Sequence, residues 1–176
     1  LDLDSMTTEF LPGIVLPVRP FPGTLAVARK EPGRYSTVPP GEFAGNMDIR
    51  DFVAGSTLHV PVHVPGALLS IGDGHAMQGD GEVTGTALET SLRGTFEVHV
   101  RKGTRLKWPR AETPTHYIAM GLHEDLDEAS RLAVRELVEF LMTEKKLAKD
   151  DAYMLCSLAA DLHVTQAVDA TKGVHV

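Results

Sequence analysis

Proline is concentrated in the first third of the chain, and this sets the strongest limit on what the chain can fold into. Nine of the eleven prolines lie within residues 1–66, with glycines between them. Proline lacks a backbone N–H and has a fixed φ, so it interrupts helices and is confined to strand ends, edges and turns. The first third is therefore predicted to form short strands joined by turns.

Alternation of apolar and polar residues marks further strands. Within residues 57–64, the side chains of Leu58, Val60, Val62 and Val64 would share one face of an extended chain, which is typical of a half-buried strand. Similar patterns predict strands within residues 83–100, most clearly at 95–100, and then at 115–120 and 162–168.

The spacing of apolar residues changes toward the C-terminus, and in residues 125–149 it is that of an amphipathic helix. Asp125 and Glu128 form a capping-box pair at its start, and Asp150 is a candidate cap for a second helix over residues 151–160. We therefore predict a single α+β domain over residues 1–176. It is mainly β, sandwich-like or barrel-like, with a C-terminal helical pair.

Charge and composition exclude several classes of function. The net charge of -7 argues against a nucleic-acid binder, since such proteins carry a basic face. No segment has the roughly 18 consecutive apolar residues of a membrane-spanning helix, and the first residues lack the basic start of a secretory signal. The single cysteine, Cys156, excludes an internal disulfide and is expected to be buried and inert. A cytoplasmic location is expected.

Residues 72–82 contain three carboxylates, a histidine and a glutamine among four glycines. If this segment is extended, Asp73 and His75 stand two residues apart and point to the same face, about 7 Å apart at the backbone. Carboxylate oxygen and imidazole nitrogen are suitable ligands for zinc, manganese or iron. A ligand site and a solvated hairpin are both consistent with this pattern.

Asp80 and Gly81 predict a tight two-residue hairpin turn, because Asp-Gly supplies positive φ values. That turn would set His75 opposite Thr86 and leave Glu82 roughly 13 Å along the sheet from His75, too far to share an ion. Glu82 can share the metal only if the loop is wider, and otherwise it acts at a distance as acid or base.

Other candidates are weaker. Asn46 and Asp48 could bind a substrate, although a turn stabilised by side-chain hydrogen bonds is the commoner explanation for such residues. The chain has no Gly-x-Ser-x-Gly elbow, no phosphate-binding loop and no dinucleotide fingerprint. This favours a metal-bound water over a covalent nucleophile as the source of reactivity.

From Arg19 onward the chain resembles the acetamidase/formamidase family, and the block at residues 72–82 is the most specific part of the resemblance. The matching segments are residues 45–50, 60–62, 65–67, 72–82, 87–89, 121–129 and 152–161. The resemblance implies a mainly β, oligomeric hydrolase that splits a short amide such as formamide or acetamide into carboxylate and ammonia. It implies a divalent metal, for which zinc is expected.

The resemblance also implies roles for single residues: Asp73 and His75 as metal ligands, and Glu82 as general base or as a carboxylate that supports the ligands. Gln78 and Asn46 are predicted to bind the substrate. Family members are longer and carry an N-terminal half before the segment equivalent to Leu1. We therefore expect this chain to be the C-terminal part of a longer protein, with a third ligand from outside the chain and a homo-oligomer or a complementary N-terminal chain as partner. The alternative is a non-catalytic ligand-binding or assembly module that keeps the amidase fold.

Overall fold

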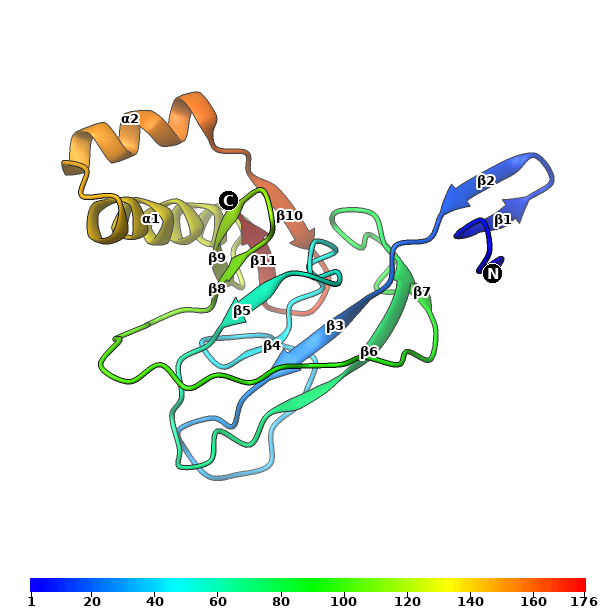
Figure 1. Ribbon diagram of the computed structural model, residues 1–176, viewed down its shortest axis with the longest axis horizontal. Helices are drawn as coiled ribbons and strands as arrows, with labels where there is room; N and C mark the ends of the chain where they lie inside the picture. The colour runs from blue at the N-terminus through cyan, green and yellow to red at the C-terminus, as the bar shows by residue number, and fades with distance from the viewer.

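The computed structural model describes all residues from 1 to 176 and consists mostly of strands in three antiparallel sheets, with two helices near the C-terminus (Figure 1). This confirms the predicted α+β class. The strands are β1 (Thr7–Leu11), β2 (Ile14–Pro17), β3 (Phe21–Ala26), β4 (Ala44–Asn46), β5 (Thr57–His59), β6 (Ser70–Met77), β7 (Leu88–Glu89), β8 (Arg110–Glu112), β9 (Tyr117–His123), β10 (His163–Gln166) and β11 (Lys172–His175). The helices are α1 (Leu126–Glu144) and α2 (Lys149–Ala159).

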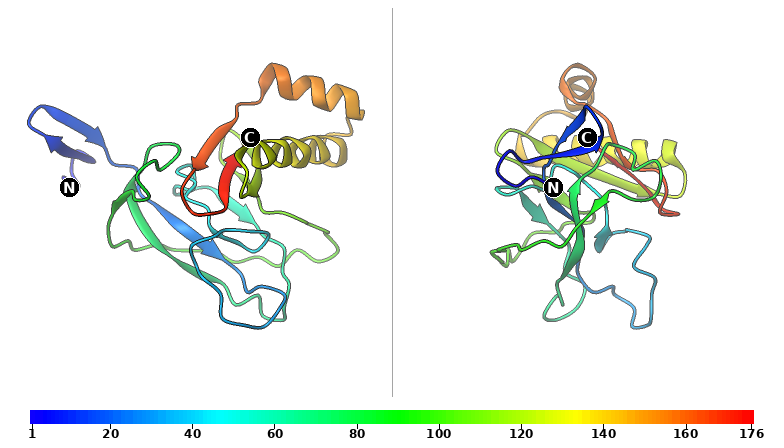
Figure 2. Two further views of the ribbon diagram at one scale, coloured as in Figure 1. Left: turned by 180° about the vertical axis from the view of Figure 1, so that it is seen from behind. Right: turned by 90° about the vertical axis from the view of Figure 1, so that its right-hand side faces the viewer.

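The two larger sheets have the strand orders β4-β3-β6-β7 and β10-β11-β9-β8-β5. A first core lies between them, built from Leu25 of β3, Met47 and Ile49 after β4, and Ile118 and Met120 of β9. Strands β1 and β2 form a separate hairpin that projects away from the body of the molecule at the N-terminal end (Figures 1 and 2).

A second core lies on the other face of the five-stranded sheet, where α1 packs against β9 and β11. Strand β9 is buried on both faces, because Ile118 and Met120 enter the first core whereas Ala119 enters the second. Its run of five buried residues follows from this double burial. No helix in the structure is both long enough and apolar enough to cross a membrane.

Helix α1 begins where the sequence predicts, because its cap is local: the Asp125 carboxylate accepts a hydrogen bond from the Glu128 N–H at 3.0 Å. It ends at Glu144, earlier than predicted, and the chain turns at Lys146, which has a φ of 60°. The assignment of Asp150 as the second cap is wrong. Ala148 occupies that position, with no side-chain hydrogen bond, and Asp150 lies within the first turn of α2.

One strand prediction is too long and another is wrong. The segment predicted at residues 57–64 pairs only over Thr57–His59, and Pro61, which cannot donate a ladder hydrogen bond, lies just beyond it. The strand predicted at 95–100 is absent: within residues 83–100 only Leu88–Glu89 is a strand, and residues 91–105 are exposed and belong to no strand. The alternating pattern at 95–100 is present, yet no strand of this chain pairs with it.

Candidate metal centre

The middle of the four-stranded sheet carries the site. In β3 and β6, Phe21 pairs with His75 and Thr24 with Gly72, so Asp73 and His75 lie on one face, as predicted. The His75 Nε2 atom lies 3.2 Å from the Asp73 Oδ1 atom and 3.4 Å from the Glu89 Oε1 atom of β7. The His75 side chain is 1% exposed and its ring meets Phe21 edge-on. These contacts hold the imidazole in one place.

Four further carboxylates lie around Asp73 and His75, and they belong to Asp48, Glu82, Glu89 and Asp169. Three overlapping groups each hold possible ligand atoms within 4.8 Å of one another, and they are Asp48–Asp73–His75, His75–Glu82–Glu89 and Asp48–Glu82–Asp169. Asp48 and Glu82 are buried, at 1% and 8% exposure. Five carboxylates and one imidazole thus share one small volume, which would cost much free energy without a compensating cation.

The turn at Asp80 and Gly81 forms, since the Glu82 N–H donates to the Gly79 carbonyl at 3.3 Å, but the hairpin predicted around it is wrong. Strands β6 and β7 pair His75 with Glu89 and Met77 with Leu88, so residues 78–87 form one wide loop. Gly81 is held to the end of β10, donating to the Thr165 carbonyl and accepting from the Ala167 N–H. The Asp80 carboxylate contacts Arg50 at 3.0 Å and His163 at 3.1 Å. These tertiary contacts replace the strand pairing that a tight hairpin would have on either side of the turn.

The wide loop changes the position of Glu82. In the tight hairpin it would lie too far from His75 to share an ion, but here their ligand atoms lie within 4.8 Å. Burial raises the pKa of the Glu82 carboxyl, nearby His75 opposes that effect, and the acids Asp169, Asp73 and Glu89 add to it. Glu82 and His75 therefore lie close enough to share an ion, and the role of Glu82 stays a prediction.

Asp48 is the strongest sign that a cation belongs here. Both of its carboxylate oxygens are buried without a hydrogen-bond partner. Burial, followed by the proximity of Asp169 and Glu82, raises the pKa of its carboxyl to about 10. A buried carboxylate without partners normally receives a proton or a metal ion. Oxygen and imidazole donors suit a divalent cation such as zinc or manganese, so the residues present fit one.

The backbone around these acids is unusual. Asp48, Asp73 and Glu82 all have positive φ values, of 51°, 60° and 41°, a conformation that costs residues with side chains about 1–3 kcal/mol. A Cβ atom on Gly23 would come within 3 Å of Asp48 Oδ1, Asp73 Oδ2 and His75 Cε1. Glycine therefore leaves the space in which these three side chains converge.

The side chains of Asn46 and Gln78, the two residues predicted to bind substrate, are hydrogen-bonded to other residues of the chain. Asn46 accepts a hydrogen bond from Thr24 Oγ1 at 2.6 Å and donates to Asp169 Oδ2 at 3.0 Å. Gln78 is hydrogen-bonded through both atoms of its amide. Both residues lie at the site, and their contact with substrate stays a prediction, as do the ligand roles of Asp73 and His75.

Sequence reasoning missed Glu89 and Asp169, and it considered Asp48 only for a turn or a substrate contact. Asp48 could have been noticed because it belongs to the segment 45–50 that carries the resemblance. The residues next to Asp169 in the sequence form no motif that would predict a role in the site. It reaches the site through a loop in which the buried Gln166 side chain accepts from the Val168 and Asp169 N–H groups. The expectation that a third ligand comes from outside the chain stays a prediction, although Asp48 is available within it.

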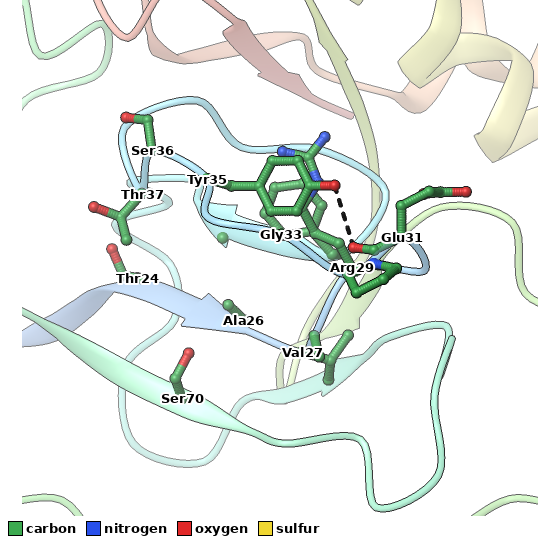
Figure 3. A pocket seen from close by; sticks show the side chains of 14 residues that line it. Thr24, Ala26, Val27, Arg29, Glu31, Gly33, Tyr35, Ser36, Thr37 and Ser70 are labelled. Carbon is green, nitrogen blue, oxygen red and sulfur yellow. Dashed lines mark hydrogen bonds between the residues drawn. The ribbon is translucent and has the colours of Figure 1, made fainter.

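Two hollows lie near the four-stranded sheet. The larger, about 480 Å³, opens beside Glu82 between the loop at 78–87 and the β1–β2 hairpin. The smaller, about 340 Å³, is lined by Thr24, Ala26 and Ser70, and there Tyr35 lies over the Arg29 guanidinium (Figure 3). Thr24 also contacts the site, because its Oγ1 atom donates to Asn46 Oδ1 at 2.6 Å and lies 3.4 Å from Asp73 Oδ2. Of these two hollows, the larger has one of the clustered carboxylates, Glu82, in its lining.

The fold and site together define a β-rich α+β protein with a candidate divalent-cation centre. The structure is similar to the acetamidase from Bacillus halodurans, with a TM-score of 0.91 and 34% identity over 97% of this chain and 57% of that one. It is also similar to the acetamidase from Yersinia enterocolitica, with a TM-score of 0.88 and 33% identity over 98% of this chain and 52% of that one.

Sequence comparison agrees. The acetamidase/formamidase family matches residues 25–175, and the chain belongs to that family. A stretch of 65 residues is 49% identical to the acetamidase of Mycolicibacterium smegmatis, covering 36% of this chain and 16% of that protein. A stretch of 48 residues is 50% identical to the formamidase of Methylophilus methylotrophus, covering 27% of this chain and 12% of that protein. The chain spans little more than half the length of the solved relatives.

Proposed function

We propose that this chain forms part of a metal-dependent amidase that hydrolyses a short-chain amide, of the formamide or acetamide kind, to a carboxylate and ammonia. The observation that carries the proposal is the unpartnered, buried Asp48 carboxylate beside Asp73 and His75. It occurs in a member of a family whose relatives are named acetamidases and formamidases.

Asp73, His75 and Asp48 would hold the cation, for which zinc is the first choice. When bound, a divalent cation polarises the amide carbonyl and lowers the pKa of water. Glu82 acts as general base: its buried carboxylate takes a proton from the attacking water and returns it to the amide nitrogen. The water oxygen forms the new bond to the carbonyl carbon, the carbon–nitrogen bond breaks, and ammonia leaves.

The hollow beside Glu82 is a suitable place for the substrate. Its walls include Met77 and Leu88 from the four-stranded sheet and Phe10 and Leu16 from the projecting hairpin. These apolar side chains suit a short acyl group, while Glu82 reaches the hollow from the carboxylate cluster. Small amides therefore have an approach to the reacting groups.

The test is ammonia release from formamide and acetamide, with elemental analysis, for the wild-type chain and for His75→Ala. The variant should lose both the bound metal and the turnover, because it removes the one nitrogen ligand. His99→Ala is the matched control: its imidazole is 72% exposed and pairs only with Glu97, so metal content and activity should be unchanged. Full turnover by the His75 variant would contradict the proposal.

The second candidate is a non-catalytic ligand-binding or assembly module that retains the amidase fold. The exposed, unpaired segment at residues 91–105 favours it, since such a surface suits a partner. A module binds metal or partner but releases no ammonia from any short amide, even when metal and the N-terminal segment are supplied. Turnover on neither amide under those conditions, with metal bound, would select this candidate.

A further inference from the structure

The side-chain amide of Gln78 lies at the junction of three segments that build the site. Its Nε2 atom donates hydrogen bonds to the Asp48 carbonyl oxygen at 2.9 Å and to the Thr165 carbonyl oxygen at 3.0 Å. Its Oε1 atom lies 2.9 Å from the His75 Nδ1 atom. The amide thus links the segment after β4, the end of β6 and strand β10.

These contacts determine which way the amide faces. A backbone carbonyl only accepts hydrogen bonds, so both carbonyls require the NH₂ end of the amide. The opposite orientation would place the Gln78 oxygen against two carbonyl oxygens and leave all three unpaired. The oxygen therefore faces His75.

The orientation of Gln78 in turn determines the tautomer of His75. An amide oxygen can only accept, so the imidazole must carry its proton on Nδ1. In the neutral ring the other nitrogen, Nε2, then has a lone pair directed at Asp73 Oδ1 and Glu89 Oε1, where the carboxylates converge. The buried ring is packed against Phe21, with ring centroids 5.0 Å apart, which keeps it from turning over.

We propose that Gln78 is a positioning residue that holds the proton of His75 on Nδ1 and so presents Nε2 to a cation. This role replaces contact with substrate, because both hydrogens of the Gln78 amide are already donated to the protein. The ligand part rests on the proposed function, whereas the tautomer does not. Partners of this kind commonly change metal affinity 10–100-fold.

The first measurement is the tautomer of His75 in the metal-free chain at pH 8.5, read from long-range ¹H–¹⁵N correlations of the imidazole rings. The wild type should show the proton on Nδ1. Gln78→Met keeps the length of the side chain but cannot accept the proton, so the proton should move wholly or partly to Nε2. Gln78→Glu keeps an acceptor oxygen and should retain the wild-type tautomer.

The second measurement is the affinity for Zn²⁺ by titration calorimetry. Gln78→Met should bind about 10–100-fold more weakly than the wild type. Glu112→Gln is the matched control, because Glu112 contacts His59 outside the site at 3.1 Å. It should alter the His59 signals and leave both the His75 tautomer and the Zn²⁺ affinity unchanged.

A wild-type ring protonated on Nε2 alone would overturn the proposal, and so would a Gln78→Met variant with the wild-type tautomer and affinity. If that variant does not fold, the wild-type and Gln78→Glu spectra decide. An absence of ammonia release would count against the proposed function alone, because neither readout depends on turnover.

Discussion

At the scale of single residues, the site contains an aspartate, Asp48, whose charged form is disfavoured by burial. Burial raises the pKa of Asp48 to about 10, above its ordinary value of 3.8. The folded chain therefore binds a proton that the unfolded chain releases near pH 4. Stability from this group is complete below pH 4 and declines as the pH rises toward 10, by at most about 1.4 kcal/mol per pH unit.

Asp48→Asn should stabilise the metal-free chain by an amount that grows with pH. The neutral amide has almost the same shape but never ionises, so its free energy of unfolding should match the wild type near pH 4 and exceed it increasingly up to pH 8.5. Urea denaturation across this range measures the difference. Burial lowers the pKa of His175 to about 4, so its effect on the free energy of unfolding is opposite to that of Asp48: below pH 6.5, stability rises with pH. Because His175 is present in both proteins, this effect cancels in the comparison.

Asp73→Asn is the control, since its side chain is 32% exposed and in contact with water. Its effect on the free energy of unfolding should be smaller than that of Asp48→Asn. A gain for Asp48→Asn that stays constant from pH 4 to 8.5 would show that Asp48 is ionised in the folded chain throughout.

At the scale of elements, β9 and α1 pack so closely at Gly121 that no Cβ atom fits between them. A Cβ atom on Gly121 would lie 1.9 Å from the Ala129 carbonyl oxygen and 2.5 Å from the Ala133 nitrogen. Both are backbone atoms of α1, so no side-chain rotation can make room. Small residues on the facing surface of the helix, Ala129 and Ala133, permit the same approach from the other side.

Gly121→Ala should therefore destabilise the chain by about 1–3 kcal/mol or more, because the helix must move away from the sheet. Urea denaturation measures the loss. Gly72→Ala is the matched control, since nothing lies within 4 Å of the added Cβ atom, and its effect should stay within about 0.5 kcal/mol. Equal stability of the two variants would mean that α1 sits farther from β9 in solution.

The elements also show which kinds of sequence pattern are reliable. The start of α1 was predictable because the cap joins residues three apart, and the shared face of Asp73 and His75 follows from the geometry of one strand. The hairpin at Asp80 and Gly81 was not, because Arg50, His163 and Thr165 come from distant segments. The pattern at 95–100 has the composition of a strand, but a strand also needs a neighbour to hydrogen-bond.

At the scale of the whole molecule, two helices, a five-stranded sheet and a four-stranded sheet lie in successive layers, and two segments lie outside them. One is the β1–β2 hairpin, which exposes Phe10 and Val15, and the other is the segment at 91–105. The chain spans little more than half of its solved relatives. A homo-oligomer or a complementary N-terminal chain remains the predicted partner.

The double variant Phe96→Ser and Val98→Thr should leave the stability of the isolated chain within about 0.5 kcal/mol of the wild type, because exposed substitutions cost little. The two side chains are 49% and 70% exposed. Urea denaturation gives the stability, and light scattering gives the molar mass of the wild type and the variant. A large loss of stability, or a smaller molar mass for the variant, would show that this segment already contacts a second copy.

The sequence by itself determined the fold class, the start of the long helix, the family and the pairing of Asp73 with His75. These depend on periodicity, capping and a specific motif, all of which act over a few residues. Only the tertiary structure decided that Asp48, Glu89 and Asp169 join them and that Glu82 comes within reach. Those positions depend on strand register and on loops that are held by residues far away in the sequence. The free energy of burying these acids comes from contacts with many segments, so no single segment of the sequence predicts it.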